Sequence, residues 1–336
     1  MRNVIYFIIL STLVDKMMID AETQNATTDK NSYCTHPDCS VKNQHTLCLA
    51  ISKRSPRLYA SGMTAWMRYQ ILMLHNRHRD NVALGLEVGQ PPATNMRKLY
   101  WDYELEQAAE IWARQCQKRH DECRNTIRFN VLQNMDVRPI VAKVTEAQLL
   151  ADAVGAWFSG SRMLPPENIW SFRLSNCSAP GGCNQHWYAA AAWASTWRLG
   201  CSQALCTAKK SSCTIFRKKR RMPRDKGGKN QTNGDAEGHN VTRTPSAEQL
   251  DHVISLESQS PLHRGILDFV GKKEERKDVR ILAYTFCNYG PAGNIDGFPI
   301  YEAGTTCSNC PPGTQCGDRT HRALCAVAGD PDCRVR

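Results

Sequence analysis

The segment Val279-Arg280-Ile281-Leu282-Ala283-Tyr284-Thr285-Phe286-Cys287 decides the expected fold of this chain. Apart from Arg280 and Thr285 its side chains are apolar, and the run contains neither Gly nor Pro. Such a run is typical of a strand that is buried on both faces of a sheet. A sheet of this kind must be covered by other elements, so the architecture depends on the amphipathic helices that the rest of the chain supplies.

Two helices are expected upstream of this strand. The first covers about 63–82 and places four apolar side chains on one face: Met63, Met67, Ile71 and Leu74. The second follows Asp102, a candidate N-cap, and repeats apolar side chains at helical spacing: Leu105, Ala108, Ala109, Trp112 and Cys116. Each helix therefore has one apolar face that can cover a sheet.

A third helix is expected after Thr145. Thr145 and Gln148 have the spacing of a capping box, and Val144 and Leu149 have that of a hydrophobic staple. Helices that flank a small sheet predict an α/β protein with a three-layer α/β/α sandwich.

The chain divides into a domain, an insertion and a tail. Residues 34–300 form the expected domain, interrupted at 207–278 by a polar, basic segment without sustained periodicity. We expect 207–278 to be a disordered surface loop between two strands, because so polar a segment cannot offset the entropy of ordering. Its candidate contacts with the domain are Cys213 and the apolar run 266–270. Residues 301–336 contain five cysteines and are expected to form a small disulfide-rich tail.

The N-terminal residues 1–22 are typical of an export signal peptide. Arg2 precedes the apolar stretch 4–14, which is too short to span a bilayer, since a span needs about 20 residues. Sixteen cysteines agree with an oxidising, extracellular destination. We therefore expect a secreted protein without a transmembrane anchor. Four acceptor triplets are candidate glycosylation sites: Asn25, Asn176, Asn230 and Asn240.

The formal net charge of +11 restricts the expected partners. Outside the cell the anionic partners are glycosaminoglycans, membrane surfaces or acidic proteins, and no nucleic acid is expected. Between Lys209 and Lys229 there are ten Lys or Arg against one Asp, so much of the excess lies in the insertion. Its densest part also fits the dibasic pattern that secretory-pathway proteases cleave: Arg217, Lys218, Lys219, Arg220 and Arg221.

Five segments carry a resemblance to a known family. They are Tyr33-Cys34 with Cys39 and Cys48; 74–79 with 91–96 and Trp101-Asp102; 112–116 with 120–124; 193–201; and Cys287-Asn288-Tyr289-Gly290-Pro291-Ala292-Gly293-Asn294. In this order and at this spacing they resemble the CAP superfamily and, within it, the insect venom allergen 5 group. The resemblance covers 33–206 and 279–316. It implies a three-layer α/β/α sandwich, the CAP domain, followed by a hinge-like tail.

The resemblance also implies three disulfides: Cys34–Cys48, Cys39–Cys123 and Cys201–Cys287. The family's partner for Cys116 is absent, because no cysteine lies between Cys48 and Cys116. Cys116 is therefore either free or paired with a cysteine peculiar to this chain. Cys177–Cys183 and Cys206–Cys213 are candidate local pairs, although spacing alone does not determine connectivity.

Many CAP proteins have a central cleft lined by two His and two Glu, which in some members holds a divalent metal. By resemblance the four positions in this chain are His120, Gln133, Gly160 and Trp187. His186 lies one residue from the expected second His, and in a short helix that shift turns its side chain by about 100°. One imidazole without a carboxylate cannot form a three-ligand zinc site, so no metal and no cofactor are expected.

Other patterns that suggest chemistry are expected to be structural. His75 and His78 stand at i and i+3 but fall in the family's helix motif, and Cys307-x-x-Cys310 is expected to belong to a disulfide knot instead of a zinc or redox site. The sequence has neither a His-Glu-x-x-His motif nor a Ser-His-Asp order. No catalytic residue is therefore expected.

Two functions follow from these features. The resemblance implies a secreted, monomeric, non-enzymatic protein that binds a lipid (sterol or fatty-acid-like) or an extracellular protein. The alternative is a heparin-like polyanion binder, or a precursor that is processed at the basic insertion. Three tryptophans could line an apolar groove but are expected to pack in the core: Trp187, Trp193 and Trp197.

Overall fold

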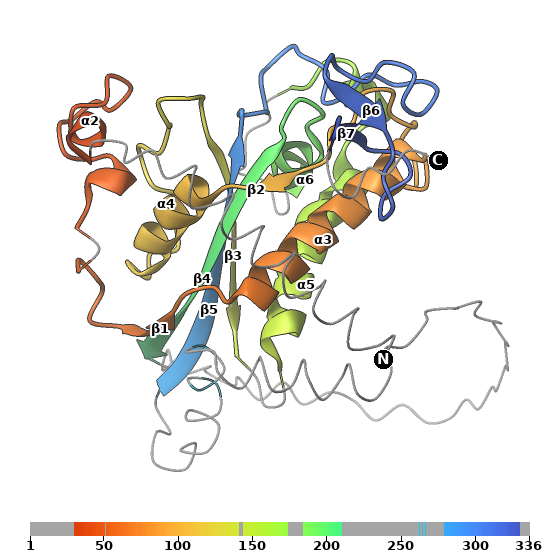
Figure 1. Cartoon of the computed structure of the whole chain (residues 1–336). Coiled ribbons are helices and arrows are strands. Elements are labelled where there is room, and N and C mark those ends of the chain that lie inside the picture. Colours follow the sequence, from red (N-terminus) through yellow and green to blue (C-terminus); the bar gives the residue numbers. More distant parts are fainter. Residues whose placement is uncertain are drawn as a thin grey trace, which may run out of the picture.

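Two long strands, β4 (Arg198–Lys209) and β5 (Val279–Gly290), form the centre of the fold (Figure 1). They pair antiparallel along their whole length, from Arg198 opposite Gly290 to Lys209 opposite Val279. The computed structural model describes residues 30–50, 52–140, 144–173, 184–209, 262, 264, 266 and 279–329. The predicted strand at 279–287 is present and continues for three more residues.

Three shorter strands complete the main sheet, whose order is β1-β4-β5-β3. β1 (Leu58–Ser61) pairs antiparallel with β4, and β3 (Leu132–Pro139) pairs antiparallel with β5. β2 (Tyr100–Trp101) pairs parallel with the first residues of β4.

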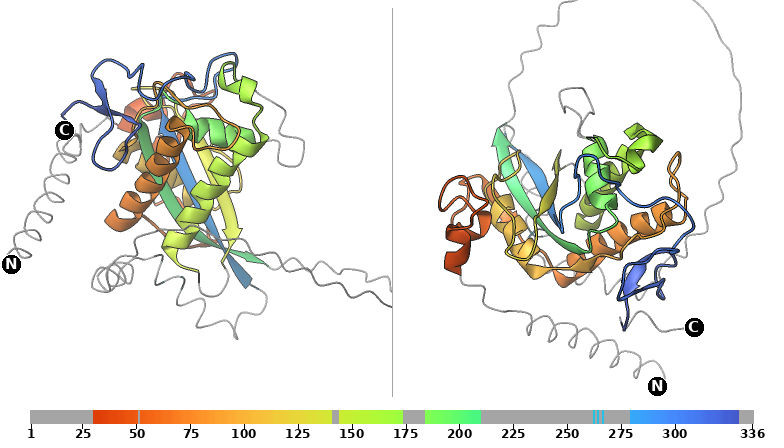
Figure 2. Two further views of the ribbon diagram at one scale, coloured as in Figure 1. Left: turned by 90° about the vertical axis from the view of Figure 1, so that its right-hand side faces the viewer. Right: turned by 90° about the horizontal axis from the view of Figure 1, so that it is seen from above.

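Helices cover both faces of the sheet, which confirms the three-layer α/β/α sandwich (Figure 2). α3 (Ala65–Ala83), α5 (Glu146–Phe158) and α6 (Asn184–Ala192) lie on one face and enclose the larger core. α4 (Tyr103–Ala113) lies on the other face and buries a smaller apolar cluster.

The second and third predicted helices begin at their expected N-caps, and the first begins two residues after its expected start. The side chains of Thr64, Asp102 and Thr145 accept backbone N–H bonds at the starts of α3, α4 and α5. The capping box is only half formed, because the side chain of Gln148 donates to Asp152 Oδ1 at 2.6 Å. On α3 the buried face includes Ile71 and His75. Leu74, which was expected on this face, is only partly buried.

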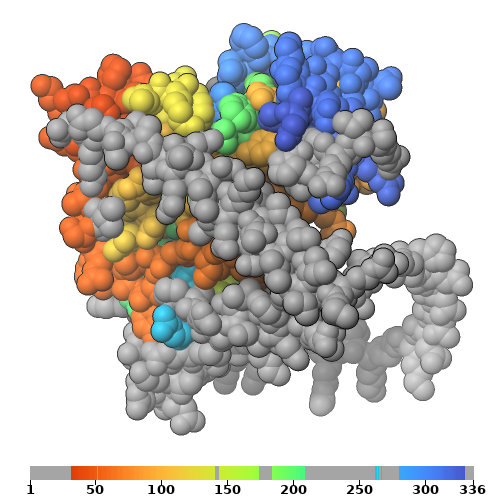
Figure 3. Space-filling model, in the orientation of Figure 1, coloured from red at the N-terminus to blue at the C-terminus, as the bar shows by residue number. Residues whose placement is uncertain are grey.

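Short elements surround the sandwich. At the N-terminal side they are α2 (Lys30–Cys34) and η1 (Thr46–Cys48); after α5 they are η2 (Ser159–Met163) and η3 (Pro166–Ile169); in the tail they are β6 (Thr314–Cys316) and β7 (Cys325–Val327). The N-terminal segment (red to orange) and the tail (blue) lie on opposite sides of the upper part of the molecule, with the yellow loop after α4 between them (Figure 3).

The tail is packed onto the domain. Ala323 and Leu324 are fully buried and belong to the larger core. Lys98 Nζ lies 2.7 Å from Asp318 Oδ2, and both side chains are buried. Ala323 N also donates to Asp80 Oδ1 on α3 at 2.7 Å. The tail and the domain therefore share one core.

The insertion begins later than expected and touches the core. The expected start at residue 207 is wrong by three residues, because β4 continues to Lys209 and pairs with the beginning of β5. Leu262 and Ile266 are buried in the larger core, while Arg264 between them is exposed. Of the predicted contacts, Ile266 is confirmed; Cys213 lies outside the described residues.

Candidate functional site

A chain of hydrogen bonds occupies the centre of the predicted cleft. His120 Nδ1 lies 2.9 Å from Gln133 Oε1, Gln133 Nε2 donates to Asn288 Oδ1 at 3.0 Å, and Asn288 Nδ2 donates to Leu105 O at 3.0 Å. With the amides oriented in this way His120 donates from Nδ1, so Nε2 is the unprotonated nitrogen of the neutral ring. This row of hydrogen bonds connects the loop after α4 to β3, β5 and α4 itself.

His120 reaches the surface, while Gln133 and Asn288 are buried. Removal of water from part of the ring lowers the pKa of His120 below its ordinary value, which the bond to Gln133 only partly offsets. The imidazole is therefore neutral near pH 7. A neutral histidine beside an amide can bind a hydrogen-bond donor, but it has no carboxylate partner in this chain of bonds.

The position of Gly160 is closed to any side chain. A Cβ atom added to Gly160 would lie 1.9 Å from the carbonyl oxygen of Asn184 and 2.5 Å from its carbonyl carbon. The first turn of α6 therefore fills the space from which the family's second Glu would project. No rotation of a flexible side chain can relieve this overlap, because both contacts are with backbone atoms.

The position of Trp187 also supplies no ligand. Trp187 is partly buried against the larger core, and its carbonyl oxygen accepts a bond from Asn134 Nδ2 at 2.9 Å. An indole offers only an N–H donor. His186 packs edge-on against Phe172, with ring centroids 5.7 Å apart. The four positions together therefore provide one ligand, His120, and this donor set does not fit a zinc ion.

Of the two histidines predicted on α3, only His75 belongs to a buried polar centre, which we define as His75, Asn76 and Arg79. His75 Nδ1 donates to Ile71 O at 2.7 Å, and His75 Nε2 accepts from Tyr289 Oη at 2.9 Å. Complete burial lowers the pKa of His75 to about 3. His78 is not part of this centre and stacks on Phe158 at 4.5 Å.

Arg79 is the residue of this centre whose role the sequence did not reveal. Its guanidinium is fully buried and donates to five carbonyl oxygens, those of Arg97, Ala191, Trp193, Ala194 and Thr196. Burial lowers the pKa of Arg79 to about 9. A cation at the position four residues after His75 on the buried face of α3 was the available signal.

Three disulfides join the pairs implied by the resemblance: Cys34–Cys48, Cys39–Cys123 and Cys201–Cys287. Cys116 bonds to Cys206 across the α4 side of the sheet, so the suggested pair Cys206–Cys213 is wrong. The pair was missed because the two cysteines are 90 residues apart and meet only when α4 covers β4. In the tail the pairs are Cys307–Cys316 and Cys310–Cys325, so Cys307 and Cys310 do not bond to each other.

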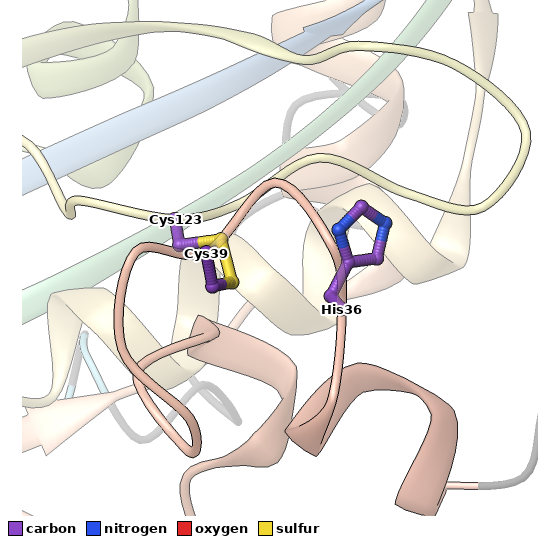
Figure 4. A group of neighbouring side chains, drawn as sticks. All are labelled: His36, Cys39 and Cys123. Atoms are coloured by element: carbon purple, nitrogen blue, oxygen red, sulfur yellow. A yellow bond between two sulfur atoms is a disulfide. The ribbon is translucent and has the colours of Figure 1, made fainter.

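A second group of potential metal ligands lies near the N-terminal segment. The His36 ring stands beside the Cys39–Cys123 disulfide (Figure 4), and the three ligand atoms lie within 4.8 Å of one another. Disulfide sulfurs are not the thiolates that zinc requires. The same argument applies to Cys307, Cys310 and Cys325. An open depression of about 600 Å³ beside His36 is lined by residues of 32–38 and 126–130.

Three large apolar side chains are exposed on a pair of bonded segments, and we call them the Trp170 surface. Trp170 is 55%, Ile295 47% and Phe298 58% exposed. Phe172 N donates to Phe298 O, and Gly297 N donates to Phe172 O, both at 2.8 Å. The backbone that carries these side chains is therefore held in place.

The predicted tryptophan packing is correct for one residue. Trp193 is buried, whereas Trp187 and Trp197 are partly exposed. Cys177, Cys183, the glycosylation candidates, the cluster Arg217–Arg221 and the signal 1–22 lie outside the described residues and stay predictions. Within the described ranges, no helix has both the length and the apolar character to cross a membrane.

Comparison with known proteins identifies relatives of this chain. The model of the cysteine-rich secretory protein family (CAP) matches residues 72–216. Venom allergen 5 of Vespula vidua is 32% identical over 182 residues, which cover 51% of this chain and 84% of the relative. Venom allergen 5 of Lycosa singoriensis is 26% identical over 294 residues, 86% of this chain. The chain spans about half the length of such longer relatives, 57% in that case.

Among solved structures, the crystal structure of Na-ASP-1 is similar to this chain. Its TM-score is 0.47 at 22% identity, over 79% of this chain and 48% of that chain.

Proposed function

Because the chain belongs to the cysteine-rich secretory protein family, we propose that it is a secreted protein that binds an extracellular lipid or protein and catalyses no reaction. The observation that carries this proposal is the closed position of Gly160. The backbone of Asn184 occupies the place of a carboxylate, and Gln133 replaces the other. Metal-assisted hydrolysis needs further metal ligands, and catalysis by a carboxylate base needs a carboxylate; these positions supply neither.

The Trp170 surface supports a binding role. Exposed Trp, Ile and Phe side chains on a held backbone bury a large apolar area at a small entropy cost when a partner covers them. Single exposed apolar residues are common, but these three lie on two segments that are hydrogen-bonded to each other, which favours a shared contact area.

The experiment uses the full chain purified from its native secretion. Native mass spectrometry should show a bound lipid or a protein partner at a defined stoichiometry. The double variant Trp170→Ser/Phe298→Ser should lose it, whereas Leu86→Ser, which changes another exposed apolar residue, should retain it. Turnover of a substrate that disappears in His120→Ala would overturn the proposal.

A second candidate function is binding of a polyanion, or processing, at the insertion. The ten Lys or Arg between Lys209 and Lys229 favour it. Retention on heparin should then fall steeply with salt, and trypsin should cut near Arg217–Arg221. Since Cys201–Cys287 joins the two sides of the cut, two fragments should separate only on a reducing gel, with an unchanged circular dichroism spectrum. If only the full-length chain is found on both the reducing and the non-reducing gel, the processing proposal is contradicted.

A further inference from the structure

Two arginines pack on one partly exposed tryptophan at the start of β4. The guanidinium carbon of Arg97 lies 4.7 Å from the centroid of the Trp197 ring, and that of Arg198 lies 4.0 Å from it. All three residues are partly exposed. We call Arg97, Trp197 and Arg198 the Trp197 site.

The Trp197 site differs in charge from the other cation–aromatic pairs of the described chain. In those four pairs the cation also bonds a carboxylate: Arg68 with Glu106, Lys98 with Asp318, Arg119 with Glu122, and Arg128 with Asp102 and Glu104. Among the residues that the structure describes, neither Arg97 nor Arg198 forms an ion pair with a carboxylate. The site therefore carries two positive charges without a bonded counter-ion.

Asp102 is the acidic group that attracts Arg198 most, but its carboxylate is already paired with another arginine. Both of its carboxylate oxygens accept bonds from Arg128, at 2.8 and 2.9 Å. Arg198 Nε is enclosed and has no hydrogen-bond partner. Burial lowers the pKa of Arg97, and the nearby charge of Arg198 lowers it further. Two partly desolvated like charges are unfavourable together, and an anion would relieve that cost.

The backbone of the site is fixed before any ligand binds. Trp197 N donates to Gly290 O at 3.1 Å, and Trp197 O accepts from Tyr100 N at 2.9 Å. The carbonyl oxygen of Arg97 accepts from the guanidinium of Arg79 at 2.7 Å. Stacking on the indole limits the movement of both guanidiniums, so little entropy is lost when they bind a ligand.

We propose that the Trp197 site binds a sulfate group of a sulfated polysaccharide. Guanidinium N–H donors match the oxygens of a tetrahedral oxyanion, and the two guanidiniums that contact one indole ring place two such donor groups close together. A chain of sulfated sugars carries many anionic groups, so sulfates adjacent to the bound one can contact other basic residues. The inference rests on the polyanion-binding candidate, but it assigns the contact to the folded domain instead of the insertion.

The test measures the dissociation constant of a heparin-derived oligosaccharide by calorimetry at several salt concentrations, on the full chain. R97Q/R198Q should weaken binding at least about 10-fold and lower the slope of log affinity against log salt by about two. R119Q is the matched control, since Arg119 also stacks on a tryptophan but is paired with Glu122; it should change affinity less than about 2-fold.

Two further variants separate the possible outcomes. R97K/R198K keeps the charge but removes the planar donors, and it should give an intermediate loss with the salt slope unchanged. A variant with Gln at all five positions 217–221 should retain binding through the Trp197 site. If binding is lost only in that variant, the insertion binds the polyanion and the present inference is wrong. If the native chain does not bind at all, the polyanion-binding candidate fails as well.

The chemistry of the ligand is tested with desulfated heparin, which retains its carboxylates. The desulfated chain should bind the native protein far more weakly. Equal binding of the two forms, or an equal loss of affinity in R119Q and R97Q/R198Q, would show that the site does not recognise sulfate.

Discussion

The buried polar centre on α3 and the cleft at His120 are both built from polar residues, but they differ in how those residues are bonded. In the centre, Arg79 has five carbonyl partners and no contact with solvent. In the cleft, a surface histidine bonds one amide, and a backbone carbonyl fills the place of a carboxylate. The centre has a charge that folding requires, whereas the four cleft positions contain no carboxylate.

This difference shows that burial of a charge is not by itself a sign of a functional site. A buried cation costs several kcal/mol unless it is fully bonded, and carbonyl groups of a folded chain can bond it as well as a carboxylate can. Arg79 therefore holds the segment 191–196 and residue 97 together through hydrogen bonds. Because it is fully buried, a ligand cannot reach it. The cleft, in contrast, is within reach of solvent at His120.

The substitution expected to have the largest effect on the buried polar centre is Arg79→Met. It leaves five carbonyl oxygens short of a donor, and we expect the free energy of unfolding to fall by about 3–5 kcal/mol or secretion to fail. Urea unfolding measures the effect. Arg77→Met on the same helix removes an exposed cation and is the control, with an expected change under about 0.5 kcal/mol. Equal effects of the two variants would contradict the role given to Arg79.

Gly160→Ala tests the cleft directly. The added Cβ would overlap the carbonyl of Asn184, so α6 must move, and we expect a loss of about 1–3 kcal/mol. The control is Gly155→Ala in α5, where a Cβ meets nothing within 4 Å and should stabilise the helix by about 0.5–1 kcal/mol. If Gly160→Ala is neutral in thermal unfolding, the position is open and a carboxylate could be restored there.

The polar centre should also make stability depend on pH. The pKa of His75 is about 3 in the folded chain and 6.5 as an ordinary histidine, so the unfolded state binds the proton first as pH falls. Stability from His75 is complete above pH 6.5 and declines towards pH 3, by about 1.4 kcal/mol per pH unit. Urea unfolding at pH 7 and pH 5 should show a smaller decline in His75→Gln than in the native chain. An identical pH dependence in both would refute the assignment.

The smallest expected effect belongs to the cleft. Gln133→Glu restores one carboxylate next to His120, yet two ligands do not make a zinc site, so elemental analysis should find no bound zinc in either protein. One tightly held zinc in Gln133→Glu that is lost on adding His120→Ala would show that a third ligand is available.

Local signals predicted the fold, and contacts distant in sequence were harder to predict. The strand at 279–287 and the caps Asp102 and Thr145 follow from apolar runs and short-range spacing, and all are present. The partner of Cys116 depends on how α4 lies on β4, which no local pattern states. The end of β4 at Lys209 was missed because Thr207 and Lys209 are polar, although the pairing with β5 holds them in the strand.

The candidate site was predictable in composition but not in shape. The residues His120, Gln133, Gly160 and Trp187 were located by resemblance, and the absence of carboxylates among them is plain in the sequence. That the backbone of Asn184 closes the Gly160 position depends on how α6 packs against η2, which only the three-dimensional arrangement shows. Arg97 and Arg198 likewise lack a carboxylate partner because the fold pairs Asp102 with Arg128, which the sequence does not show.

Three disulfides close loops that overlap along the sequence, because each loop begins a few residues before the preceding one ends: Cys39–Cys123, Cys116–Cys206 and Cys201–Cys287. This overlap limits how far the domain can be stretched. The shortest covalent path from Cys39 to Cys287 follows only about 12 residues of backbone, roughly 40 Å, whereas the intervening chain could extend to roughly 850 Å. A tensile force on the domain would be carried by these sulfur links. While the bridges are intact, stretching could lengthen the segment between Cys39 and Cys287 by only a small fraction of its contour, and a reducing agent would release the remainder of that segment.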